Sequence, residues 1–282
     1  MAPRHGSTAP WRVLTATALP LLLAAGVVLL SAAALHAAET ETAKQPGART
    51  YTPEQKAYMD SLDKQLAAQD YQKFREALAN TNDGPHLSAA LDWGRARTLD
   101  GGGILLPLTY SALLWKAADM NPDYDFMRQT SDLMAMYGLL AAMADAPKCA
   151  DRSAPEHHVT SILQGYKRQF QHTAKLPDKQ KQVVIDTAIA MERKLAAKRA
   201  DDKYLCRFGL HEHMDISQKY GDKAYEEVPK QPGQIGRQMV LRSENDYTPK
   251  FNPREQWQPK QEAARAAFPE LVAKLLTAAE GK

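Results

Sequence analysis

The chain has 282 residues, which is enough for one fair-sized domain or two small ones. Its 24% charged and 44% hydrophobic residues are typical of a globular protein and exclude an intrinsically disordered one. The formal net charge of +3 argues against a dedicated nucleic-acid-binding protein, which would carry a strongly basic domain or face. We therefore expect no nucleic-acid partner.

The N-terminal segment, residues 1–38, has the pattern of an export signal. Two arginines precede an uncharged run at residues 13–35, and small residues follow that suit cleavage after Ala37 or Ala38. The alternative is an uncleaved anchor, because about 20 apolar residues can cross the hydrocarbon core as a helix. In both cases the basic flank stays in the cytoplasm. The sequence thus predicts a periplasmic body that meets the membrane only if this segment is retained.

Helix-forming patterns follow one another through the middle of the chain. Thr52, Pro53 and Gln55 give the first start signal, a capping box with Pro at the first helical position. Apolar residues then recur at helical spacing in successive segments. We expect helices at about residues 53–79, 87–99, 106–120, 124–144, 153–170 and 177–195. Short helical pieces, rather than strands, are expected between residues 204 and 228.

The segment at residues 124–144 is apolar nearly all round, which is typical of a helix buried by its neighbours. We expect it at the centre of the fold. Short connections between successive helices predict an all-α fold, either an antiparallel helical bundle or a short stack of helical hairpins. Three units at a fixed period cannot be aligned, so the sequence supports no repeat family.

The character of the chain changes at Pro229. Five prolines and no long periodic stretch lie between there and residue 260, which predicts an extended arm. The expected organisation is a flexible leader at residues 39–50, a helical domain at 51–228, the Pro-rich arm at 229–260, and a C-terminal helix at 261–282 that packs on the domain.

Cys149 and Cys206 are the two cysteines of the chain. In an oxidising compartment such a pair normally closes into a disulfide, and the alternative is two separately buried thiols. A redox-active role is not expected, because the chain has no Cys-x-x-Cys spacing. We therefore predict a structural disulfide.

Potential metal ligands gather at two places. His157 and His158 are adjacent, and His211 and His213 flank Glu212. On a helix, residues two apart point in nearly opposite directions, so the second pair cannot chelate one ion from a regular helix. The spacing matches no structural or hydrolytic zinc pattern. No metal site is predicted, and metal handling stays a minor alternative.

Catalytic signatures are absent from the sequence. There is no Gly-x-Ser-x-Gly elbow and no nucleotide-binding loop, and the glycines at 101–103 precede apolar residues and read as a helix stop. Carboxylate pairs for glycoside cleavage cannot be assigned, since their separation is spatial. We expect no cofactor and name no catalytic residue.

The arm combines basic and aromatic residues, a composition typical of contact surfaces. The candidate partner-binding residues are Arg242, Tyr247, Phe251, Arg254 and Trp257. The alternative is that the arm wraps its own helical body and buries these rings within the molecule.

These features predict a non-enzymatic periplasmic protein that binds or helps assemble another envelope protein or a cell-wall component. The alternative is an envelope hydrolase whose carboxylates meet only in the fold. A deep cleft with two close, partly buried carboxylates would favour the enzyme, and a broad apolar groove would favour the binding protein.

Overall fold

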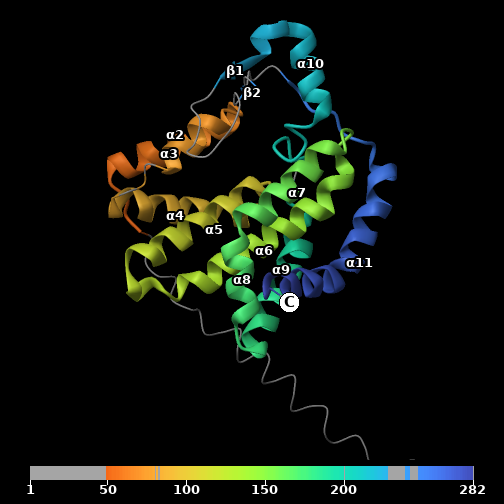
Figure 1. The fold of residues 1–282 in the computed structure, drawn as a ribbon. Coiled ribbons are helices and arrows are strands. Elements are labelled where there is room, and N and C mark those ends of the chain that lie inside the picture. Colours follow the sequence, from red (N-terminus) through yellow and green to blue (C-terminus); the bar gives the residue numbers. More distant parts are fainter. Residues whose placement is uncertain are drawn as a thin grey trace, which may run out of the picture. The chain divides into compact units, whose positions relative to one another are not determined.

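The computed structural model describes residues 49–79, 81, 83–199, 201–227, 239–241 and 247–281 (Figure 1). Contacts divide the chain into Met1–Thr50 and a second compact unit, Tyr51–Lys282, to which all the described helices belong. The expected export signal lies outside the described residues. No helix in the described part of the chain has both the length and the apolar character needed to cross a bilayer.

Ten α-helices and one small sheet make up the described residues. The helices are α2 (Pro53–Ala67), α3 (Tyr71–Ala79), α4 (Gly84–Leu99), α5 (Leu105–Met120), α6 (Met127–Asp145), α7 (Ser153–Gly165), α8 (Lys167–Lys175), α9 (Asp178–Ala196), α10 (Leu210–Tyr220) and α11 (Arg254–Ala279). The strands β1 (Tyr225–Glu227) and β2 (Met239–Leu241) pair antiparallel, with Tyr225 opposite Leu241. The all-α prediction is confirmed.

The predicted start of the first helix is confirmed in atomic detail. The hydroxyl of Thr52 accepts a hydrogen bond from the Gln55 N–H at 3.2 Å, and the Gln55 side-chain oxygen accepts from the Thr52 N–H at 3.0 Å. The helix does not run on to residue 79, however. The chain turns at Gln69, which has a left-handed φ of +56°, and α3 begins two residues later. The apolar spacing continues across this turn and conceals it.

A second expected helix is also divided. The pattern over residues 153–170 predicts one helix, whereas α7 ends at Gly165 and α8 begins at Lys167. Tyr166 between them has a φ of −110° and a ψ of 20°, outside the helical range. Its hydroxyl donates to the main-chain carbonyl of Leu108 at 2.8 Å, so the junction is attached to α5.

The expected position of α6 at the centre is confirmed by its contacts. It packs against α5, α7, α8, α9 and α11. Tyr137 and Leu140 on this helix are fully buried in the larger of two apolar clusters. The smaller cluster lies between α2, α3, α4 and α5, around Phe74 and Trp93. Helix α5 contributes side chains to both clusters and so joins the two halves of the core.

The predicted disulfide is confirmed. Cys149, just after α6, is bonded to Cys206 in the loop before α10, and their Cα atoms are 5.2 Å apart. The backbone at Cys149 also pairs with Phe251 in an antiparallel bridge. There the Asn252 N–H donates to the Lys148 carbonyl at 2.7 Å. Three segments distant in sequence therefore meet at one point.

The boundary between arm and final helix differs from the expected one. We expected the arm to extend to residue 260, whereas α11 begins at Arg254, directly after Pro253. Pro259 and Pro269 lie inside α11, where each removes one helical hydrogen bond. Figure 1 shows that the helix changes direction part-way along, which is the expected effect of a proline in a helix interior. Much of the expected arm, residues 229–238 and 242–246, lies outside the described residues.

Candidate ligand-binding site

The aromatic residues predicted to contact a partner lie against the body of the chain. Phe251 packs on the larger apolar cluster. The Tyr247 ring centre is 5.7 Å from the guanidinium carbon of Arg207. Arg254 is exposed and donates to the Gln258 side chain at 3.0 Å. At these positions the arm follows the alternative interpretation, in which its rings pack within the molecule.

Trp257 and Arg242 are the remaining two candidates for partner contact. The Trp257 ring centre is 5.2 Å from the Nζ atom of Lys148, a contact within the chain. Arg242 lies outside the described residues. Contact with a partner stays a prediction for all five residues, and the structure gives the three described rings an internal role.

The histidines lie on two helices. His157 and His158 are on α7, and His211 and His213 are on α10, where the helical spacing separates them. Among the described residues, no three His, Cys, Asp or Glu side chains are grouped so that they could hold a metal ion. His158 instead lines a cavity.

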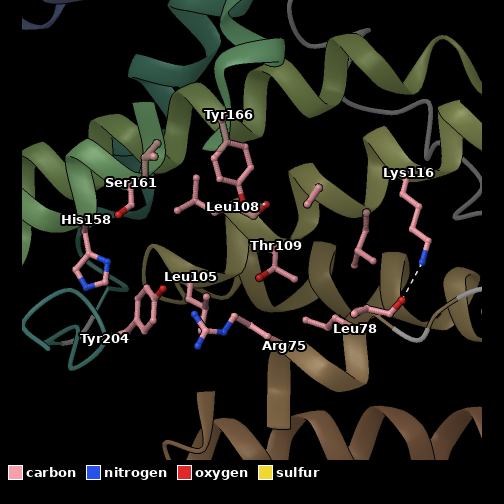
Figure 2. A pocket seen from close by; sticks show the side chains of 14 residues that line it. Arg75, Leu78, Leu105, Leu108, Thr109, Lys116, His158, Ser161, Tyr166 and Tyr204 are labelled. Carbon is pink, nitrogen blue, oxygen red and sulfur yellow. Dashed lines mark hydrogen bonds between the residues drawn. The ribbon is translucent and has the colours of Figure 1, made fainter. Parts of the chain in front are cut away.

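This cavity has a volume of about 390 Å³ and lies between α3, α5, α7 and the loop at Tyr204 (Figure 2). Cavities of this size are typical of small-molecule sites. Figure 2 shows His158, Ser161 and Tyr204 near one end and Lys116 near the other. The lining residues are Arg75, Leu78, Ala79, Leu105, Leu108, Thr109, Ala112, Leu113, Lys116, His158, Ser161, Ile162, Tyr166 and Tyr204.

One face of α5 forms the length of the cavity. Leu105, Leu108, Ala112 and Lys116 recur three or four residues apart, which places them on the same side of the helix. At about 1.5 Å per residue, this face extends for roughly 16 Å. The cavity therefore suits an elongated, largely apolar molecule.

The loop that carries Tyr204 is fixed to the start of α5. The Asp202 carboxylate accepts hydrogen bonds from the Ile104 N–H at 2.7 Å and from the Tyr204 N–H at 3.0 Å. Gly103 is required here, because a Cβ atom at this residue would collide with the Asp202 carboxylate. The glycines predicted to end α4 thus also allow the loop to approach α5.

His158 is the most deeply buried polar side chain of the cavity wall, with 4% of its surface exposed. Burial, together with the neighbouring His157, lowers the pKa of His158 to about 4. The imidazole is therefore neutral near neutral pH, with one donor and one acceptor nitrogen. Its Nε2 atom has no hydrogen-bond partner among the residues that the structure describes. The ring centre lies 4.6 Å from that of Tyr204, so the two rings form one wall.

Arg75 contributes a positive charge on the α3 side of the cavity. Figure 2 shows its guanidinium group beside Tyr204 and Leu105. Burial raises the pKa of the Tyr204 phenol, and the positive charge of Arg75 opposes this rise. Arg75 forms no ion pair with a described residue, and its side chain is exposed.

Lys116 supplies the second positive charge, at the opposite end. Its Nζ atom donates to the main-chain carbonyl of Ala79 and to the Thr81 hydroxyl, both at 3.3 Å. These bonds direct the ammonium group toward the end of α3. Among the described residues, the cavity lining includes no Asp or Glu, so the formal charge of these lining residues at neutral pH is positive.

Two further cavities lie beside α11. One of about 300 Å³ is lined by apolar side chains of α6, α7 and α11 and by Lys274. The other, of about 760 Å³, lies where α7 faces the start of α11, and its lining includes one carboxylate, that of Glu156. None of the three cavities has the two facing carboxylates that glycoside cleavage requires.

A buried acid and a histidine form a separate polar pair. The Oδ2 atom of Asp132 on α6 lies 2.6 Å from Nδ1 of His172 on α8. Burial raises the pKa of Asp132 to about 7, although the hydrogen bond to His172 opposes the rise. Neither residue lines any of these three cavities.

Sequence reasoning considered His158 as a metal ligand and missed Arg75 and Tyr204. The spacing of apolar residues along α5 was visible, but it does not distinguish a cavity wall from a core face. Tyr204 comes from a loop, and its position depends on the bonds of Asp202, which no local pattern predicts.

Comparison of the chain with protein-family models, curated proteins and solved structures finds no match. The function is therefore inferred from the geometry of the cavity.

Proposed function

We propose that this protein is an exported, non-enzymatic binding protein of the periplasm, and that it holds a small, largely apolar envelope component in the cavity between α3, α5 and α7. The observation that carries this proposal is the apolar cavity of about 390 Å³ with the buried His158 in its wall. Ligand sites are typically apolar cavities with a few polar groups that fix the orientation of the ligand.

Two features support the location. The N-terminal segment has the pattern of an export signal. The disulfide between Cys149 and Cys206 suits an oxidising compartment. The alternative of an envelope hydrolase gains no support from the cavities, because at most one carboxylate lines any of the three.

The test is to fill the cavity. Ala112 is exposed on α5 and lines the cavity, so Ala112→Phe places a ring in the ligand space without enlarging a core residue. Ala190→Phe is the matched control, since Ala190 is exposed on α9 and lines none of the three cavities. Each protein is purified from its native envelope and extracted with organic solvent, and the extract is analysed by mass spectrometry.

We expect an apolar small molecule in stoichiometric amount with the natural protein and with Ala190→Phe. Its amount should fall at least tenfold with Ala112→Phe. Equal amounts with both variants, or no bound molecule with any of the three proteins, would contradict the proposed function. Circular dichroism spectra that match among the three proteins exclude misfolding as the cause.

A further inference from the structure

The charge of the cavity lining is one-sided. Of the lining residues that the structure describes, Arg75 and Lys116 are charged at neutral pH, and both are cationic. His158 is neutral because it is buried, and the other polar groups of the lining are the hydroxyls of Thr109, Ser161, Tyr166 and Tyr204. A cationic ligand would meet repulsion in this lining, and an anionic one would meet attraction.

The two cations differ in what they already bind. The ammonium of Lys116 is bonded to the Ala79 carbonyl and the Thr81 hydroxyl. Arg75 has no carboxylate partner among the described residues. Its planar guanidinium can donate two parallel hydrogen bonds to a carboxylate or phosphate, which favours this type of anion. Arg75 is therefore the side chain of the lining best able to bind an anion.

The position of Arg75 defines the orientation of such a ligand. Figure 2 shows the guanidinium beside the hydroxyl-bearing ring of Tyr204, on the side of the cavity where His158 and Ser161 lie. Leu78 lies on the stretch toward Lys116 (Figure 2), and Leu108, Ala112 and Leu113 of α5 add further apolar surface to the lining. The end near Tyr204 thus offers a cation and hydroxyls, and the middle is mainly hydrocarbon. The far end carries the Lys116 ammonium, which is already hydrogen-bonded to Ala79 and Thr81.

We propose that the cavity binds a single-chain amphiphile with an anionic head group, the head group lying against Arg75 and Tyr204 and the hydrocarbon chain lying along α5. This inference rests on the proposed function, since it requires that the cavity hold a ligand. It names the class of that ligand: a monomeric fatty acid or alkyl phosphate, taken up without its surrounding bilayer. The cavity volume and the face of α5, roughly 16 Å long, fit one extended chain.

The experiment compares three probes that share a ten-carbon chain: decanoate, decanol and decylamine. Binding is measured by calorimetry at fixed ionic strength and below the concentration at which each probe aggregates, because exposed charges are screened by salt. The proteins are the natural chain, Arg75→Gln, and Lys179→Gln as the matched control. Lys179 is exposed on α9 and lines none of the three cavities, so both variants lose one positive charge.

We expect decanoate to bind at least tenfold more tightly than decanol, and decylamine to bind most weakly. Arg75→Gln should weaken decanoate binding about tenfold, the usual effect of losing a hydrogen bond to a charged group, and leave decanol binding unchanged. Lys179→Gln should change neither. Equal affinity for decanoate and decanol, or equal effects of the two variants, would overturn the anionic class.

Failure of this inference can be distinguished from failure of the proposed function. Decanol binding that Ala112→Phe abolishes, with no effect of Arg75→Gln on any probe, retains the cavity as a binding site and rejects the anionic head group. Absence of binding by every probe counts against both. Sedimentation of the protein with phosphatidylglycerol vesicles in the absence of decanoate binding would reject a monomeric ligand in favour of a bilayer surface.

Discussion

The side chain of Asp132 has none of its surface exposed, and its Oδ1 atom has no hydrogen-bond partner in the described part of the chain. Its pKa is about 7 in the folded chain, against an ordinary value of 3.8. The folded state therefore holds a proton on Asp132 over a pH range in which the unfolded state has released it. The protonated acid stabilises the fold below about pH 4, and this contribution is lost as the pH rises to about 7.

We predict that Asp132→Asn flattens this pH dependence. Between pH 5 and pH 8 the free energy of unfolding of the natural protein should fall by about 2 kcal/mol more than that of the variant, because the amide does not ionise. Denaturant unfolding at the two pH values measures the difference. Asp60→Asn, on the exposed face of α2, is the control. Parallel pH profiles for Asp132→Asn and the natural protein would show that Asp132 does not titrate in this range.

The cysteine pair is the residue-scale feature that the sequence predicted best. With two cysteines in the chain, a single intramolecular pairing was possible, and the structure has it. Arg75 is the opposite case. Its proposed role depends on the loop at Tyr204, which comes from another part of the chain, and on the lack of a carboxylate partner among the described residues; neither is encoded in the residues around position 75.

At the scale of elements, α11 is joined to the core through buried charges. The Gln261 side chain donates to Asp145 of α6 at 2.7 Å, and Arg265 donates to Glu192 of α9 at 2.9 Å. Arg199 donates to both of these carboxylates. Each acid therefore has partners from two segments. Because Asp145 and Glu192 are almost completely buried, the loss of a partner is costly.

Replacing Arg265 should loosen the final helix. We predict that Arg265→Gln lowers the free energy of unfolding by about 2 kcal/mol, since Glu192 loses two charge-assisted hydrogen bonds but keeps that from Arg199. Amide hydrogen exchange in α11 should become faster. Lys274→Gln breaks an ion pair with Glu270 on the same helix, where both side chains are 71% exposed, and should have little effect. Similar exchange in the two variants would contradict this role of the buried pair.

The elements themselves were predicted where a periodic apolar stripe and its end signals coincide. The boundaries of α4 and α5 lie within a few residues of those expected, and α6 lies at the centre. The errors occur where conformation changes without a change of pattern. Gln69 and Tyr166 interrupt helices whose apolar spacing continues, and α11 includes Pro259, which the sequence pattern assigned to an extended arm.

For the whole molecule, the export interpretation makes a prediction about oxidation. A chain that lacks residues 1–38 should stay in the cytosol with Cys149 and Cys206 reduced, whereas the full chain should be oxidised in the periplasmic fraction. Closing a loop between cysteines 57 residues apart stabilises the fold by about 4 kcal/mol at most. Thiol alkylation of fractionated cells, followed by non-reducing electrophoresis, measures this directly. Free thiols in the full-length periplasmic protein would refute the prediction.

The final helix also affects when the fold can form. Helix α11 contacts α6 and α8, and the strand-like bridge just before it pairs with Cys149. Before α11 has been synthesised, apolar parts of α6 face water. Cys149 then also lacks the backbone of Phe251, with which it pairs in the folded chain. Tertiary closure must therefore wait until α11 has been synthesised. If the chain is exported as proposed, this delay keeps it unfolded while it crosses the inner membrane.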